Sequence, residues 1–258
     1  METAPTNGGT RTKHAIVSQN KFRWVCSRAE ERGMKVNSAK TSMLCISDAM
    51  SYKASAFIYD AEGSKIQSSD KMKILGFHFS NKPTMHAHVE ALQKRFRCQY
   101  WTLFHLKRAG FNEEKLAKVY RTVILPIAYY CQVVYHAMIT DEQDQQIERL
   151  QSKALKCIYG PYHSYASMRE MAGVTTLRQR RIQATDKFAS KCVGSDRFSR
   201  WFPLRQAGWA GARRGEKYHE EFARSDRLKN TPIFYMRRRM NGKPGRKYGE
   251  RNRQYRDT

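Results

Sequence analysis

Acidic side chains are scarce in this chain of 258 residues, which has 23 Asp and Glu against 48 Lys and Arg and a formal net charge of +25. A cationic excess of this size needs a polyanion or salt to neutralise it. Nucleic acid is therefore the first partner to expect, and an anionic membrane surface is the second. Long apolar runs are also missing, because no stretch of about 18 apolar residues occurs, and this excludes a membrane-spanning helix. The first residues have no apolar segment, so we expect no signal peptide.

Cysteines at metal-binding spacing are absent as well. The six cysteines never form a C-x-x-C motif and are widely scattered, at Cys26, Cys45, Cys98, Cys131, Cys157 and Cys192. Such spacing is typical of reduced thiols in an intracellular protein rather than of a disulfide framework or a zinc site. We therefore expect no metal site and no disulfide in this chain.

The first third of the chain predicts a helix followed by a small sheet. Apolar positions over residues 13–32 have helical spacing, and Gly33 follows as a natural helix end. Three short apolar or aromatic segments then predict the strands of an antiparallel sheet, at 43–47, 54–59 and 73–79. A turn at 60–63 separates the second segment from the third.

Beyond Pro83 the pattern is helical. Apolar residues at spacings of three and four predict a helix over 85–109, which ends before Gly110. Asn112 is a predicted N-cap for the next helix, and Pro126 must bend or end that helix because proline lacks a backbone donor.

A capping box predicts the start of a third long helix. Thr140 and Gln143 have the required spacing, and the apolar pattern continues to Gly160. Shorter helical stretches follow at about 164–172 and 175–193.

The last fifth of the chain differs in composition. Residues 205–258 contain 16 Lys and Arg and 6 Asp and Glu, so this segment carries +10 (16 − 6) of the net charge. Aromatic residues are interleaved with the basic ones, and six glycines interrupt any long helix.

Four phrases of this sequence resemble the back half of the reverse transcriptase of non-LTR (LINE-type) retrotransposons. They are RGMKVNSAKTSMLCIS (32–47), KMKILGFHFS (71–80), YRTVILPIAYYCQVVYH (120–136) and ERLQSKALKCIYG (148–160). Later phrases are similar to the region after the thumb in fungal elements of that group, at 177–182, 186–189 and 232–256. The resemblance covers roughly residues 13–256.

Composition and resemblance together imply an α+β fold in five parts. A small antiparallel palm-remnant sheet with an N-terminal helix comes before a mostly α-helical thumb and a basic C-terminal extension. The expected parts are a disordered start (1–12), a partial reverse transcriptase palm with motifs D and E (13–82), a helical thumb (83–160), a helical post-thumb region (161–204) and a basic, aromatic-rich C-terminal extension (205–258).

The resemblance assigns roles to two short motifs. The phrase G-x-x-x-N-x-x-K-T matches motif D, which implies that Lys40 protonates the leaving pyrophosphate. The residues alone also fit a solvated loop lysine. Leu75, Gly76 and Phe77 match motif E, the hairpin of the family that holds the primer end. Read by themselves, they fit a core strand with a bulge at the glycine.

Basic residues of the thumb and of the extension are the candidates for phosphate contact. Those on the thumb helix are Lys94, Arg95, Arg97, Lys107 and Arg108. Those of the extension are Arg237, Arg238, Arg239, Arg246 and Lys247. The alternative for each of them is an ordinary solvated helix face.

The carboxylates that two-metal phosphoryl transfer requires are missing from the sequence. The family supplies them from motif A and from a Y-x-D-D phrase, whereas this chain has no adjacent aspartates. Its closest pair, Asp141 and Asp144, lies at a predicted helix start, where the helix dipole explains acidic residues. We therefore expect no cofactor in this chain, with Mg²⁺ belonging to the complete enzyme of the family.

Three functional readings follow. The first is a fragment of an RNA-directed DNA polymerase that retains template-primer-binding parts without the catalytic aspartates, and that is inactive alone. The second is a non-catalytic, non-specific RNA- or DNA-binding protein that acts through its basic helices and tail. The third is a structural protein whose tail is a nuclear-targeting signal, at Arg237–Arg239 and Arg246–Lys247. All three imply an intracellular protein, and a nuclear one is expected.

Overall fold

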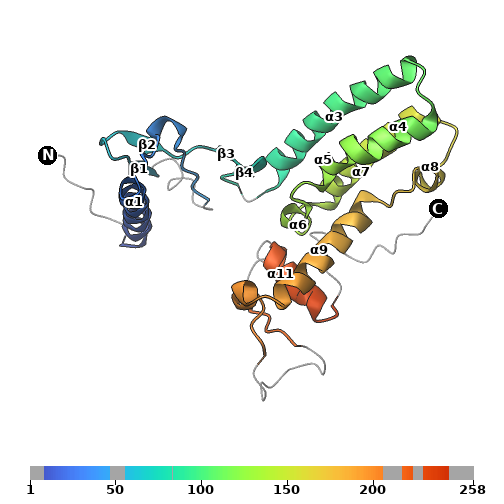
Figure 1. The fold of residues 1–258 in the computed structure, drawn as a ribbon. Helices are drawn as coiled ribbons and strands as arrows, with labels where there is room; N and C mark the ends of the chain where they lie inside the picture. Colours follow the sequence, from blue (N-terminus) through green and yellow to red (C-terminus); the bar gives the residue numbers. More distant parts are fainter. Residues whose placement is uncertain (1–8, 47–55, 83, 206–216, 223–228, 244–258) are drawn as a thin grey trace. The chain divides into compact units, whose positions relative to one another are not determined.

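The protein has the α+β fold that the sequence predicts, in a computed structural model that describes residues 9–46, 56–82, 84–205, 217–222 and 229–243 (Figure 1). Helices predominate among these residues, with two small antiparallel sheets near the N-terminus. The chain divides into two compact units, residues 1–87 and residues 88–258. None of the described helices combines the length and the apolar character that crossing a bilayer requires.

The first unit opens with helix α1 (Gly9–Glu30). Gly33 follows the helix with a φ of +69. This left-handed backbone conformation is common at helix ends, and glycine adopts it at little cost because it has no Cβ atom. The expected disordered start at 1–12 is wrong for its last four residues, because residues 9–12 belong to α1. Extending an existing helix adds one hydrogen bond per residue fixed, so even a sequence rich in glycine and threonine can continue it.

Strands β1 (Phe57–Tyr59) and β2 (Lys65–Gln67) form the first sheet, an antiparallel hairpin. The predicted turn is there, and the Asp60 carboxylate stabilises it by accepting hydrogen bonds from the backbone N–H groups of Glu62 (3.0 Å) and Ser64 (2.7 Å). This turn leads into β2, a strand that the sequence pattern did not predict. Polar and apolar residues alternate over only three positions of β2, which is too few to indicate a strand.

Strands β3 (Lys71–Ile74) and β4 (Phe77–Ser80) form the second sheet. The single bulged strand predicted over 73–79 is therefore wrong, because the chain reverses between Ile74 and Phe77. The predicted strand at 43–47 is also absent over its described part, residues 43–46, where Met43 makes only an isolated bridge to Ser68.

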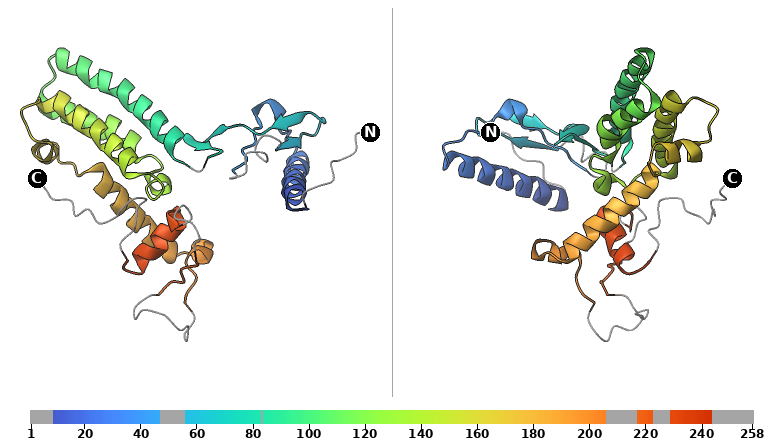
Figure 2. Two further views of the ribbon diagram at one scale, coloured as in Figure 1. Left: turned by 180° about the vertical axis from the view of Figure 1, so that it is seen from behind. Right: turned by 45° about the vertical axis from the view of Figure 1, so that its right-hand side comes forward.

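The second unit is helical (Figures 1 and 2). Its helices are α3 (His86–Arg108), α4 (Glu113–Val119), α5 (Leu125–Tyr129), α6 (Gln132–Tyr135), α7 (Asp141–Tyr159), α8 (Tyr165–Met171), α9 (Leu177–Val193) and α11 (Pro232–Met240). A 3₁₀ turn, Asp196–Trp201, follows α9. The core of this unit is built from fully buried side chains that include Leu103, Tyr120, Ile147, Leu155 and Ile158.

The predicted helix caps are confirmed. The Asn112 side chain accepts a hydrogen bond from the Lys115 backbone N–H at the start of α4. Thr140 and Gln143 form both bonds of a capping box at the start of α7. Pro126 does not end its helix, because a π-helical turn at Tyr120–Ile124 leads directly into α5, where the proline occupies an N-terminal position that needs no donor.

The described part of the C-terminal extension is packed against the helical unit. Tyr218 and Met236 lie in a buried cluster with Ala189, Cys192 and Phe202. Helix α11 contacts α9 and α6, and Figure 2 shows it lying against α9. Residues 217–222 and 229–243 are therefore part of the folded body rather than a separate tail.

Candidate nucleic-acid interface

Helices α3 and α7 run in the same direction and are joined at both ends by side-chain hydrogen bonds. Near their starts, Gln93 Nε2 donates to Gln146 Oε1 at 3.0 Å. Near their ends, Lys107 Nζ donates to the backbone oxygens of Cys157 (2.8 Å) and Ile158 (3.0 Å). At 1.5 Å per residue, the two joining points lie about 21 Å apart along α3.

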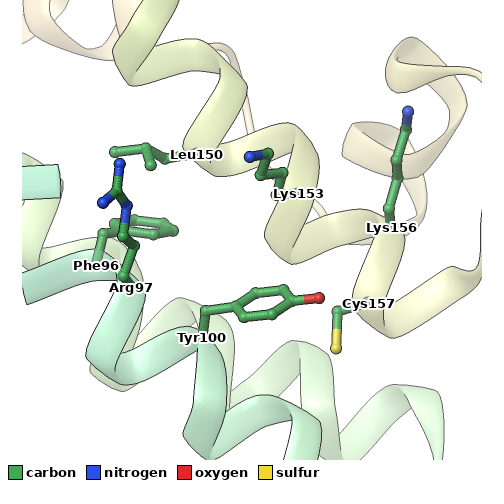
Figure 3. Close-up of a pocket in the computed structure, with 7 residues that line it drawn as sticks. All are labelled: Phe96, Arg97, Tyr100, Leu150, Lys153, Lys156 and Cys157. Carbon is green, nitrogen blue, oxygen red and sulfur yellow. The ribbon is translucent and has the colours of Figure 1, made fainter. Parts of the chain in front are cut away.

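A groove of about 520 Å³ lies between the two helices (Figure 3). Helix α3 contributes Phe96, Arg97 and Tyr100, and helix α7 contributes Leu150, Lys153, Lys156 and Cys157. Its floor is therefore aromatic and apolar, and its charged groups are all cations. Figure 3 shows Tyr100 pointing from α3 toward Cys157, with Lys156 pointing away from the floor.

The groove carries no compensating negative charge. Among the described residues that line it, none is acidic. Burial raises the pKa of the Cys157 thiol and that of the Tyr100 phenol, so both groups are neutral at pH 7. The nearest acid along α7, Glu148, is used elsewhere, because it accepts hydrogen bonds from the Tyr165 hydroxyl (2.8 Å) and the Arg178 backbone N–H (2.6 Å). Among the described lining residues, the charged groups that a phosphate would meet are all cations.

The five cations predicted on the thumb helix lie in different surroundings. Of these five, only Arg97 lines the groove, whereas Lys94 and Arg95 are exposed on other parts of α3. Lys107 is outside the described groove lining, and its ammonium donates to the last carbonyls of α7, where a cation complements the helix dipole. The Arg108 guanidinium lies 5.9 Å from the Phe104 ring centroid.

Sequence reasoning missed the cations of α7. Lys153 and Lys156 line the groove, and both are exposed, as is Arg149 one turn earlier. Their spacing of four and then three residues places all three on one face of the helix. That spacing was readable within the phrase ERLQSKALKCIYG, but α3 and α7 are far apart in sequence, and nothing local shows that they pair.

The basic run of the extension is engaged inside the protein. Arg237 is buried, and its Nε donates to the Trp201 carbonyl at 2.5 Å while its guanidinium pairs with Glu221 at 3.4 Å. Arg239 forms a two-point pair with Asp186, at 2.9 and 2.5 Å. Both guanidinium groups therefore have partners within the fold, and the Arg237 side chain is 6% exposed whereas that of Arg239 is 32% exposed.

The other predicted residues of the extension differ from these two. Arg238, half-buried on the same helix, borders a hollow next to Phe234. Arg246 and Lys247 lie outside the described residues.

Lys40 lies on a short 3₁₀ turn, Ser38–Lys40, in the first unit. The Asn37 side chain accepts a hydrogen bond from the Lys40 backbone N–H (3.1 Å), and the Thr41 hydroxyl donates to the Asn37 carbonyl (2.9 Å). The asparagine and threonine of the motif therefore build the turn. The lysine side chain is exposed, and within the described part of the chain its ammonium has no ion-pair partner.

Leu75 and Gly76 are the two central residues of the β3–β4 hairpin. Their φ angles are +47 and +82, as the tight turn that matches strand twist requires at both positions. Leu75 is 87% exposed, whereas Phe77, the first residue of β4, is buried. The hairpin implied by the resemblance is thus present, with a leucine at its tip in a conformation that leucine rarely adopts.

Asp144 is buried and ion-paired. Arg181, itself buried, hydrogen-bonds to Asp144, and Arg178 Nε lies 3.6 Å from the same carboxylate. The helix dipole alone, as predicted, therefore does not explain this residue. In the described ranges, no group of three or more His, Cys, Asp or Glu side chains is placed to hold a metal ion.

Comparison of the chain with protein-family models, with curated protein sequences and with solved structures finds no match.

Proposed function

We propose that the protein binds the phosphate backbone of RNA or DNA in the groove between α3 and α7. The observation that carries the proposal is the set of three groove cations, Arg97, Lys153 and Lys156, over an aromatic and apolar floor whose described lining contains no acidic residue. A polyanion is the ligand whose charge complements such a surface, and the net charge of +25 favours its approach from a distance.

The proposed binding is independent of base sequence. Lysine and arginine contacts to phosphates position a strand without reading its bases. Along the helix axes Arg97 lies about 6 Å past Gln93, and Lys153 and Lys156 lie about 10 and 15 Å past Gln146, so the three cations span about 9 Å. This span corresponds to roughly three phosphates of one strand at 3.4 Å each, which fits one phosphate for each cation.

A salt titration tests this proposal. Affinity for a fluorescent oligonucleotide is measured by anisotropy between about 50 and 200 mM salt. Three neutralised phosphates predict a log–log slope of about −2.1 for single strands and about −2.7 for duplexes, and additional contacts would make it steeper. A flat dependence on salt would contradict the proposal.

A second proposal rests on the resemblance to LINE-type reverse transcriptases, with Lys40 as a proton donor to pyrophosphate and Leu75, Gly76 and Phe77 as a primer grip. What supports it is that Lys40 is exposed on a well-formed turn and that the β3–β4 tip presents Leu75 to solvent. Under this proposal the chain corresponds to the template-primer-binding part of such an enzyme, and Mg²⁺ would be held by aspartates that its sequence does not contain.

A primer-extension assay with an RNA template and Mg²⁺ or Mn²⁺ tests the second proposal. The chain alone is expected to bind the template-primer without extending it, because two converging carboxylates are needed to hold the metal ions. DNA synthesis by the purified chain would overturn this account. A nuclear location is part of the proposal, and a fluorescent fusion confined to the cytoplasm would contradict it.

A further inference from the structure

Trp101 lies on α3 beside the groove and is exposed over 57% of its surface. It follows Tyr100, which lines the groove, and lies one helical turn after Arg97, about 6 Å farther along the axis. Arg97 forms no ion pair with a described residue, and a large exposed aromatic ring one turn from such a cation is unusual for a solvated helix face. Trp101 is not among the described lining residues, but residues four apart lie on the same helix face, so a ligand bound at Arg97 is within reach of the indole.

Neighbouring rings support Trp101 from one side. Phe104 meets it edge to face, with ring centroids 5.7 Å apart, and His105 lies at 6.2 Å with an interplanar angle of 32°. The Phe104 ring in turn contacts His105, with centroids 5.9 Å apart, and the Arg108 guanidinium lies over the Phe104 ring. These contacts hold the indole in place, so a ligand that stacks on it would lose little side-chain entropy in doing so.

The charge around this ring favours a nucleic acid over a protein partner. Between Ala91 and Arg108, helix α3 contains five Lys and Arg residues and no acidic residue. A protein surface would need a matching row of carboxylates, whereas a nucleic acid supplies both the phosphates and flat bases that stack on aromatic rings.

We infer that Trp101 stacks on an unpaired base, and that the ligand of the groove is therefore single-stranded nucleic acid. This inference rests on the proposed function and adds the class of ligand to it. In a duplex each base is stacked between its neighbours, so an indole that approaches from outside, such as that of Trp101, contacts only sugar and phosphate. In a single strand whose backbone lies in the groove, a base can turn outward onto the indole.

The test compares Trp101→Ala with Trp24→Ala, a matched control on α1 whose ring is 63% exposed. The ligands are an oligothymidylate of about 20 nucleotides, a duplex of the same length and an abasic strand with the same phosphates. Trp101→Ala is expected to weaken binding of oligothymidylate by roughly 5- to 150-fold, with affinity for the duplex and the abasic strand unchanged. The Trp24 variant should match the parent on all three ligands.

Trp101→Phe keeps a smaller ring and should bind oligothymidylate with intermediate affinity, and unchanged binding of the duplex by the alanine variant shows that its loss does not arise from unfolding. An equal loss on single strand and duplex, or no loss on either, would overturn the inference. Removal of the groove lysines separates this failure from failure of the proposed function. If Lys153→Gln/Lys156→Gln binds every ligand like the parent, the groove proposal fails, whereas if it weakens them all and Trp101→Ala changes none, only the stacking inference fails.

Discussion

The groove can be tested most directly through Lys153 and Lys156. The double variant Lys153→Gln/Lys156→Gln removes both ammonium groups while keeping long side chains of high helix propensity. Both residues are exposed, and neither forms an ion pair within the described ranges, so the fold should not be affected. The net charge falls from +25 to +23.

The expected loss of affinity follows from counterion release. Each phosphate neutralised contributes about 0.7 log units per log unit of salt on a single strand and about 0.9 on a duplex. Two lost contacts therefore flatten the slope by about 1.4 or 1.8. At 0.1 M salt, taking 1 M as the reference, this corresponds to roughly 25-fold weaker binding of single strands and 60-fold weaker binding of duplexes.

The matched control removes the same charge from another helix. Lys187 and Lys191 are exposed one turn apart on α9, away from the groove lining. The variant Lys187→Gln/Lys191→Gln should keep the parent slope in anisotropy titrations over the same salt range. Equal losses in the two double variants would refute the reasoning, because net charge rather than a local contact would then explain binding.

Three further predictions concern the fold. Asp144→Asn leaves the Arg181 guanidinium buried without its anion and should lower the free energy of unfolding by about 3–5 kcal/mol, whereas Asp144→Leu/Arg181→Met should regain most of it in urea titrations. Leu75→Asn relieves the positive φ at the hairpin tip, and exchange of the hairpin amides should slow by about fivefold; unchanged exchange would argue against strain there. Burial raises the pKa of Tyr135 from 10.0 to about 12, so the neutral phenol stabilises the folded state below pH 10. This contribution to the free energy of unfolding, roughly 3 kcal/mol, is lost as the pH rises from 10 to about 12. In urea titrations at these pH values, the free energy of unfolding of Tyr135→Phe should fall less steeply with pH than that of the parent.

Local signals in the sequence predicted local structure well. Asn112 and the pair Thr140 and Gln143 cap their helices as expected, because a cap involves only residues within one turn. The strand at 43–47 was wrong because a short apolar run has no pairing information of its own. At Leu75 and Gly76 the turn was hidden because leucine is not a usual residue at positive φ.

Tertiary pairing decided which cations are free, and this could not be read from composition. Arg237 and Arg239 look like part of an exposed basic run, yet Glu221 and Asp186, which are 16 and 53 residues away in sequence, bind them. Nothing in the sequence distinguishes Lys153 and Lys156 from other exposed lysines. They line a groove only because α3 lies beside α7. A count of positive charge thus favours a polyanionic ligand in general, but it does not indicate which surface would bind one.

The two bridges between α3 and α7 have a consequence for the rate of binding. Gln93 and Gln146 at one end, and Lys107 with the last carbonyls of α7 at the other, fix the spacing of the helices before any ligand arrives. Under the proposed function, a strand would meet a surface that needs no rearrangement, so association should proceed in one step at a rate that electrostatic attraction sets. Salt would act mainly on the rate of association, and the lifetime of the complex would depend on short-range contacts within the groove.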